Sequence, residues 1–413
     1  MVPGTPALRF KKRLLFLCTV LLLTVHAPAR QADADDSQRL YPYGGPSPEE
    51  IMALGNPYAS KQELIGILNR VFCDPEDCRS WLVPKSGGIS LFDGFIPWNT
   101  PVSGIGKTWR TPSELPPMKT SRKPLDGVRI AIDPGHLGGK WAYREQRETL
   151  VEGKYPVREG TSTLIVSELL ARYLKGMGAN VLLLRDSATP VSTLTPEIIA
   201  KRLAKMRNTK VTPSLQREAD MFFVRRVEIN ARAAKLREFK PDLTVCIHFD
   251  AGSGPKPVDK LHLLLNGSYS REELDDPELR RGMLSKLLGK VHPVEAELSA
   301  HVAASMVRRL QLPPFVYAVP SKKVKEVPGN DYLWCRNLLA NCLYPGPVIY
   351  TEPYAMLNSI TARRMMMGDY AGYQYFSGKR LPSIYREYAR SVADGIRNYF
   401  VSKRPAPGKT VSS

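Results

Sequence analysis

From residue 127 to about residue 400, short apolar segments alternate with longer amphipathic ones, and few folds accommodate such a pattern. The apolar segments are short, rich in branched side chains and flanked by turn residues, which indicates buried strands. They read VRIAID, NVLLLRD, DLTVCIHFD, KLHLLLN and PGPVIYTEPY. Segments with helical periodicity lie between these strands and after the last one, at 162–178, 223–239, 294–312 and 383–400. Strands alternating with helices of this length predict an α/β fold, in which a mainly parallel, twisted sheet carries helices on both faces.

The chain before this alternation has a different character. A basic start, an apolar run at 14–25 and the small residues Ala27 and Ala29 predict a signal peptide over 1–29, with an uncleaved membrane anchor as the alternative. We expect a small N-terminal α+β region with a Pro-rich linker over 30–122, the main α/β domain over 123–402 and a flexible tail over 403–413. The protein is therefore expected to be exported and to have no membrane span once the signal is cleaved.

The formal net charge of +19 favours anionic partners. In an exported protein these include a cell wall rich in carboxylates or anionic lipid. The basic residues are spread along the chain and belong to no recognisable nucleic-acid module, so we expect no nucleic-acid partner.

Five cysteines remain after removal of the signal peptide. Export permits disulfides, and the short spacings predict two local pairs, Cys73–Cys78 and Cys335–Cys342. Cys246 lies within a predicted buried strand and is expected to be a free thiol. The alternative is that all five cysteines are reduced.

Two predicted strands end in a histidine next to glycine, proline or aspartate. The segments are AIDPGHLGG at 131–139, with His136, and TVCIHFDAG at 244–252, with His248. The carboxyl ends of parallel strands meet at one edge of the sheet, which is where α/β folds carry out chemistry. We therefore expect both histidines to bind one metal ion, and two imidazoles with one carboxylate form a typical catalytic zinc site.

Two acidic residues complete this hypothesis. Glu159 directly precedes a predicted helix start and is the preferred third zinc ligand, while Glu145, Glu148 and Glu152 are the alternatives. Glu352 ends another predicted strand and is expected to act as the general base. Each has a purely structural alternative: Glu159 as a helix cap and Glu352 as an ion-pair partner. A third strand histidine, His262, is expected to be structural.

The motifs together resemble a known enzyme family. DPGHLGG, a glutamate before a helix ending GANVLLLRD, then DLTVCIHFDAG and PGPVIYTEP are similar to the zinc-dependent N-acetylmuramoyl-L-alanine amidases of peptidoglycan turnover, over about 125–400. The family order of His, Glu, His and catalytic Glu falls on His136, Glu159, His248 and Glu352. The resemblance implies a bacterial periplasmic or cell-envelope enzyme that cleaves the amide between N-acetylmuramic acid and L-alanine in peptidoglycan or muropeptides.

Other functions are compatible with the same residues. They are a zinc peptidase or deacylase acting on another envelope amide, and a non-catalytic wall-binding protein. The resemblance also suggests a regulatory role for the charged insert at 268–293, since some family members carry a helix over the metal that an activator protein removes. The alternative for this insert is a surface helix whose apolar stripe packs on the domain.

Overall fold

The computed structural model describes residues 40–92, 94–103, 106–118, 123–254, 256–317 and 323–405. The predicted signal peptide at 1–29 and most of the predicted tail lie outside these residues. No helix in the described ranges is both long and apolar enough to cross a membrane.

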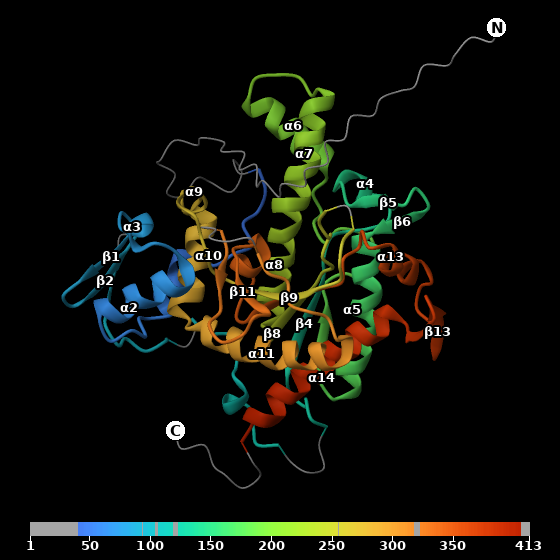
Figure 1. The fold of residues 1–413 in the computed structure, drawn as a ribbon. Coiled ribbons are helices and arrows are strands. Elements are labelled where there is room, and N and C mark those ends of the chain that lie inside the picture. The colour runs from blue at the N-terminus through green and yellow to red at the C-terminus, as the bar shows by residue number, and fades with distance from the viewer. Residues whose placement is uncertain are drawn as a thin grey trace. The chain divides into compact units, whose positions relative to one another are not determined.

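The five strands predicted from the apolar segments lie in one seven-stranded sheet. They are β4 (Arg129–Pro134), β7 (Asn180–Leu183), β8 (Leu243–Ile247), β9 (Leu261–Leu265) and β12 (Val348–Pro353). The sheet also contains β10 (Lys325–Glu326) and β11 (Leu333–Cys335), which were not predicted. The strand order is β10-β11-β9-β12-β8-β4-β7 (Figure 1). The strands β7, β4, β8 and β12 run parallel, whereas β9 is antiparallel to β12. The predicted mainly parallel α/β fold is confirmed, with an antiparallel step at β9 that the sequence pattern did not indicate.

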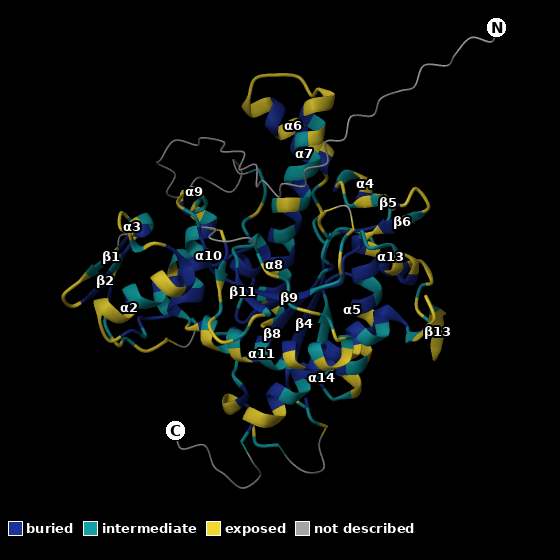
Figure 2. Cartoon of the chain, viewed as in Figure 1, coloured by how far each residue is buried: buried dark blue, intermediate teal, exposed yellow. Residues whose placement is uncertain are grey.

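Helices cover both faces of this sheet. One face carries α5 (Glu159–Gly176), α11 (Val291–Leu310) and α14 (Ile384–Lys403), and the other carries α8 (Glu228–Phe239), α10 (Pro277–Leu288) and α12 (Leu339–Leu343). Because side chains alternate along a strand, Ile132 and Val245 pack on the first side while Ala131 and Cys246 pack on the second. Figure 2 shows the resulting buried interior along the strands.

The N-terminal region contains the expected mixture of helix and strand. Its elements are α1 (Pro48–Ala53), α2 (Lys61–Ile67), a π-helical turn (Leu68–Phe72), α3 (Pro75–Cys78) and the antiparallel strands β1 (Leu82–Lys85), β2 (Gly88–Leu91) and β3 (Gly94–Pro97). Ile51 and Leu54 belong to the same buried cluster as Leu284 on α10. The Tyr58 hydroxyl donates a hydrogen bond to the Leu287 carbonyl at 2.8 Å. The region and the α/β sheet therefore share one core.

The charged insert forms α9 (Arg271–Leu274) and α10. Its apolar stripe is buried in the shared core and consists of Leu274, Leu279, Met283, Leu284, Leu287 and Leu288. Two of its acidic residues, Asp276 and Glu278, pair with Arg226 on the neighbouring helical segment. The structure therefore adopts the alternative in which the stripe packs on the domain.

The remaining elements extend from the sheet. They are a 3₁₀ turn (Pro112–Glu114), α4 (Trp141–Arg144), the hairpin β5 (Glu148–Val151) and β6 (Tyr155–Arg158), α6 (Pro196–Met206), α7 (Pro213–Phe222), a π-helical turn (Phe223–Val227), α13 (Ser359–Met366) and the hairpin β13 (Tyr373–Phe376) and β14 (Lys379–Pro382).

The predicted disulfides are absent, since all five described cysteines are buried free thiols. Cys342 donates its thiol to the Leu279 carbonyl at 3.6 Å. Cys73 and Cys78 hydrogen-bond to each other as thiols, and this bond is the main reason the pKa of Cys78 is lowered. The structure does not show the predicted pairs Cys73–Cys78 and Cys335–Cys342, and Cys246 is the buried free thiol that was expected.

Candidate active site

The two motif histidines meet at the carboxyl ends of β4 and β8. The strands are parallel with Pro134 opposite Ile247, and the Gly135 amide donates to the Ile247 carbonyl at 2.9 Å. A β-carbon on Gly135 would lie 2.4 Å from the His248 ring, so only glycine allows this approach. As a result, the rings of His136 and His248 lie 5.1 Å apart, centroid to centroid.

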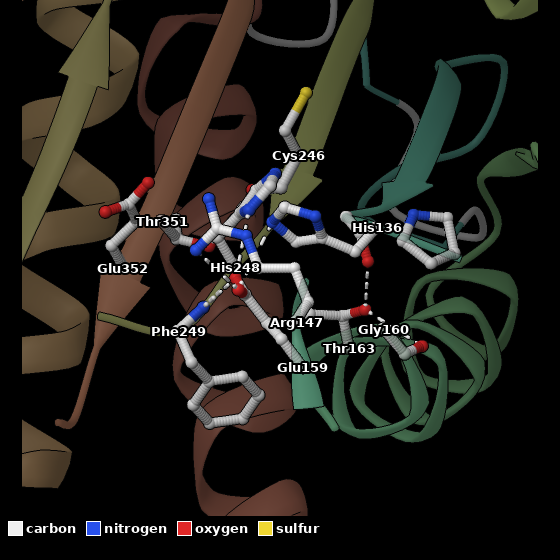
Figure 3. A network of polar contacts seen from close by, with 12 residues as sticks. His136, Arg147, Glu159, Gly160, Thr163, Cys246, His248, Phe249, Thr351 and Glu352 are labelled. Carbon is white, nitrogen blue, oxygen red and sulfur yellow. Dashed lines mark hydrogen bonds and ion pairs between the residues drawn. The ribbon is translucent and has the colours of Figure 1, made fainter. Parts of the chain in front are cut away.

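Glu159, the first residue of α5, joins the two imidazoles. Its Oε2 lies 3.2 Å from His136 Nε2, and its Oε1 lies 3.2 Å from His248 Nδ1. Oε1 also accepts a hydrogen bond from the Phe249 amide at 3.3 Å. Figure 3 shows the three side chains converging, His136 and His248 from just beyond the ends of β4 and β8 and Glu159 from the start of α5. One donor atom from each residue falls within 4.8 Å of the others.

This donor set fits a zinc ion. Zinc binds imidazole nitrogen and carboxylate oxygen at about 2.0–2.2 Å in tetrahedral geometry, which places neighbouring ligand atoms about 3.3 Å apart. Both nitrogen–oxygen distances agree with this spacing. The side chains of His136 and His248 are 19% and 16% exposed, so solvent reaches the cluster, while the Glu159 side chain is only 3% exposed.

The surroundings keep Glu159 ionised. Burial raises its pKa, but the charge of His136, a hydrogen bond from His248 and the charge of Arg147 outweigh burial and lower the pKa to about 2. Arg147 Nη1 lies 3.7 Å from Glu159 Oε2. These contacts therefore favour the carboxylate form of Glu159, which is the form that binds a metal ion.

The three alternative carboxylates lie elsewhere. Glu145 is on the other side of His136, with Oε1 3.8 Å from Nδ1 and Oε2 accepting from the Leu137 amide at 2.9 Å. Such an outer carboxylate orients a ligating imidazole. Glu148 pairs with Arg158 across the β5–β6 hairpin, and Glu152 is exposed in the turn of that hairpin.

Two buried arginines, which were not predicted as part of the site, hold the loop that carries His136. Arg232, 2% exposed, donates to Asp133 at 2.7 Å and to Glu228 at 2.8 Å. Arg185 donates to the carbonyls of Pro134 at 3.2 Å and Gly160 at 2.8 Å. The second arginine therefore ties the loop that carries His136 to the first turn of the helix that begins with Glu159.

Glu352 lies next to the cluster, near the end of β12. The carbonyl of the preceding residue, Thr351, accepts the His248 backbone N–H at 3.1 Å. Burial raises the pKa of Glu352, but a hydrogen bond from His262 and the charges of His262, His248 and Arg336 lower it overall. His262 Nε2 lies 3.1 Å from Glu352 Oε2, so the histidine expected to be structural contacts the expected general base. A histidine within the otherwise apolar strand LHLLL was the available signal, because a buried polar side chain needs a partner.

No protein-family model matches the chain, and no curated protein matches it. Solved structures with a similar arrangement include three amidases. The N-acetylmuramyl-L-alanine amidase Ami1 from Mycobacterium smegmatis is 16% identical, with 67% of this chain and 99% of that chain covered and a TM-score of 0.39. Ami1 from Mycobacterium abscessus is 19% identical, with 67% and 99% covered and a TM-score of 0.38. An N-acetylmuramoyl-L-alanine amidase from Clostridium difficile 630 is 13% identical, with 67% and 96% covered and a TM-score of 0.36. Similarity at this level establishes neither family nor activity, so the function follows from the chain's own residues.

Proposed function

We propose that this chain is an exported, zinc-dependent hydrolase that cleaves the amide between N-acetylmuramic acid and L-alanine of the peptidoglycan stem peptide. One observation carries the proposal: the donor atoms of His136, Glu159 and His248 gather within 4.8 Å of one another beside a second carboxylate, Glu352. Three protein ligands of this type leave one position for water or substrate, as in catalytic zinc sites.

The two carboxylates have different roles. Both oxygens of Glu159 face imidazole nitrogens, at 3.2 Å each, so this residue holds the metal. Zinc bound there supplies Lewis acidity, which polarises the amide carbonyl and makes water a better nucleophile.

Glu352 transfers the proton. Its lowered pKa leaves it as a carboxylate that accepts a proton from the attacking water. It then returns the proton to the departing amino group of L-alanine, so that the amine leaves neutral. His262 occupies one carboxylate oxygen, Oε2, and Oε1 remains for this transfer.

The motif order in the sequence and the net charge of +19 support the substrate assignment. Peptidoglycan stems carry free carboxylates, to which a basic protein is attracted. This substrate places the protein in the periplasm or cell envelope of a bacterium, where an activator protein is a further expected partner.

Product analysis tests the proposal. Purified protein loaded with zinc is incubated with purified peptidoglycan, and the products are identified by mass spectrometry. We expect free stem peptides with an L-alanine N-terminus and intact glycan strands. Fragments cut within the peptide indicate a peptidase, released acetate indicates a deacylase, and binding to peptidoglycan without products indicates a wall-binding protein. Any of these three outcomes overturns the amidase proposal.

A further inference from the structure

His262 and Glu352 form a pair that the zinc cluster does not require. They stand directly opposite each other in the antiparallel register of β9 and β12, 90 residues apart in sequence. His262 is 2% exposed, whereas the Glu352 side chain is 19% exposed. The carboxylate is therefore held from the protein side, while solvent still reaches it.

The contact with Glu352 indicates which nitrogen of His262 donates a hydrogen bond. An ionised carboxylate only accepts hydrogen bonds, so the Nε2 that lies 3.1 Å from Glu352 Oε2 carries the proton. The other ring nitrogen, Nδ1, is buried and has no hydrogen-bond partner among the described residues. The ring therefore presents the N–H of Nε2 to the general base.

Packing fixes the orientation of the ring as well. Phe315 and Tyr317 lie against the imidazole, with ring centroids 4.7 Å and 5.7 Å away. The Tyr317 hydroxyl lies 3.3 Å from His262 Nε2, and Arg336 lies 3.5 Å beyond it. A ring held on several sides has little freedom to turn its N–H away from Glu352.

A structural role alone does not account for this histidine. Every other residue of β9 is leucine, and a leucine at position 262 would avoid a buried nitrogen without a partner. A buried polar group without a hydrogen-bond partner destabilises the fold, so such groups are expected mainly where a protein needs them for function.

We propose that His262 is a positioning residue for the general base. Its Nε2–H holds Oε2 of Glu352, which sets the direction of the carboxylate and leaves Oε1 to take the proton from the attacking water. This inference rests on the proposed hydrolase function.

Kinetics of paired variants test it. His262→Leu matches the neighbouring leucines but removes the donor, and His262→Gln retains an N–H. We expect His262→Leu to lower kcat on a soluble muropeptide by roughly 10- to 100-fold, with KM and zinc content unchanged, because a misplaced base loses the benefit of orientation. His262→Gln should recover part of the loss. His301→Leu, on the outer helix α11, serves as the control and should keep the wild-type kcat.

A double-variant cycle separates positioning from general damage. If His262 acts through Glu352, His262→Leu causes no further loss in a Glu352→Gln background. A wild-type kcat in His262→Leu, or the same fold-loss in both backgrounds, overturns the proposal.

Nitrogen-15 NMR of the histidine rings supplies a readout that needs no turnover. We expect His262 to carry a proton on Nε2, hydrogen-bonded to Glu352, in the wild type. An Nε2 without a proton in a protein with confirmed amidase activity overturns the positioning role alone. Absence of any hydrolase activity in the wild type overturns the function on which that role depends.

Discussion

At the scale of single residues, the three proposed zinc ligands differ in how much their side chains contribute to the fold. His248 contributes both a ring nitrogen toward Glu159 and a backbone N–H to β12, while its ring stacks on Tyr350 with centroids 5.0 Å apart. An alanine at this position keeps the backbone bond and loses only the ring. The His248→Ala variant therefore isolates the ligand role better than a change in the buried loop around His136.

His248→Ala is predicted to lose the metal. Two remaining protein ligands hold zinc far more weakly than three, so zinc content falls from one per chain toward zero after dialysis, and activity falls with it. Elemental analysis of the dialysed protein measures this, with His301→Ala as the matched histidine control. Full zinc retention in His248→Ala would contradict the assignment.

Glu352→Gln is predicted to separate metal binding from chemistry. The amide has nearly the shape of the carboxylate but accepts no proton, so the variant should keep zinc and its melting temperature while kcat falls about 10²-fold or more. Steady-state kinetics on a muropeptide, together with zinc analysis, provide the check. Turnover at the wild-type rate in the zinc-loaded variant would refute the role of general base.

Residue types at strand and helix ends were enough to nominate His136, Glu159, His248 and Glu352. Their positions follow from elements that the local pattern already predicts. The contact of His262 with Glu352 was not predicted, because it depends on the pairing of β9 with β12. The register between two distant strands cannot be inferred from either strand alone.

At the scale of elements, the close crossing of α10 and α12 depends on one glycine. A β-carbon on Gly282 would lie 2.2 Å from Cys342 Sγ and 2.8 Å from the Cys342 carbonyl oxygen. The crossing brings the insert that carries the apolar stripe against the helix that leads into β12.

Gly282→Ala is therefore predicted to destabilise the protein by about 1–3 kcal/mol, the usual cost of overpacking a core. Gly176→Ala at the end of α5 is the matched control, because its β-carbon meets no atom within 4 Å. That substitution should be neutral or stabilise by up to about 1 kcal/mol, since alanine favours helix. Urea denaturation measures both, and equal stabilities for the two variants would argue against the close crossing.

Helical and strand periodicity predicted the main elements of the sheet and its covering helices. The direction of β9 was not predictable in this way, because an apolar run of five residues reads the same in either direction. The sequence also did not determine whether the charged insert is buried. Its acidic residues suggested an exposed helix, but two of them pair with Arg226, which lies more than 40 residues earlier in the chain.

At the scale of the whole molecule, the N-terminal region and the α/β sheet depend on each other. Side chains from α1 and from α10 are buried in one cluster, so removing the first leaves the second exposed to water. A chain that begins at residue 123 is predicted to aggregate or to lose its cooperative thermal transition, whereas one that begins at residue 40 keeps these contacts and unfolds as a unit. Calorimetry of the two chains tests this, and a cooperative transition in the shorter chain would show that the region is dispensable for folding.

The backbone at His136 implies a conflict between the stability of the fold and the proposed catalytic site. Its φ of +57° lies in the left-handed region, where a β-carbon costs roughly 1–2 kcal/mol and glycine costs nothing. Since His136→Ala and His136→Gly both lack the ring, His136→Gly should be the more stable of the two by about 1 kcal/mol in chemical denaturation. Equal stabilities would show that the loop relaxes without the ring. Selection for a long-lived fold alone would favour glycine at this position, and a histidine there is consistent with a strained backbone kept for the proposed metal site.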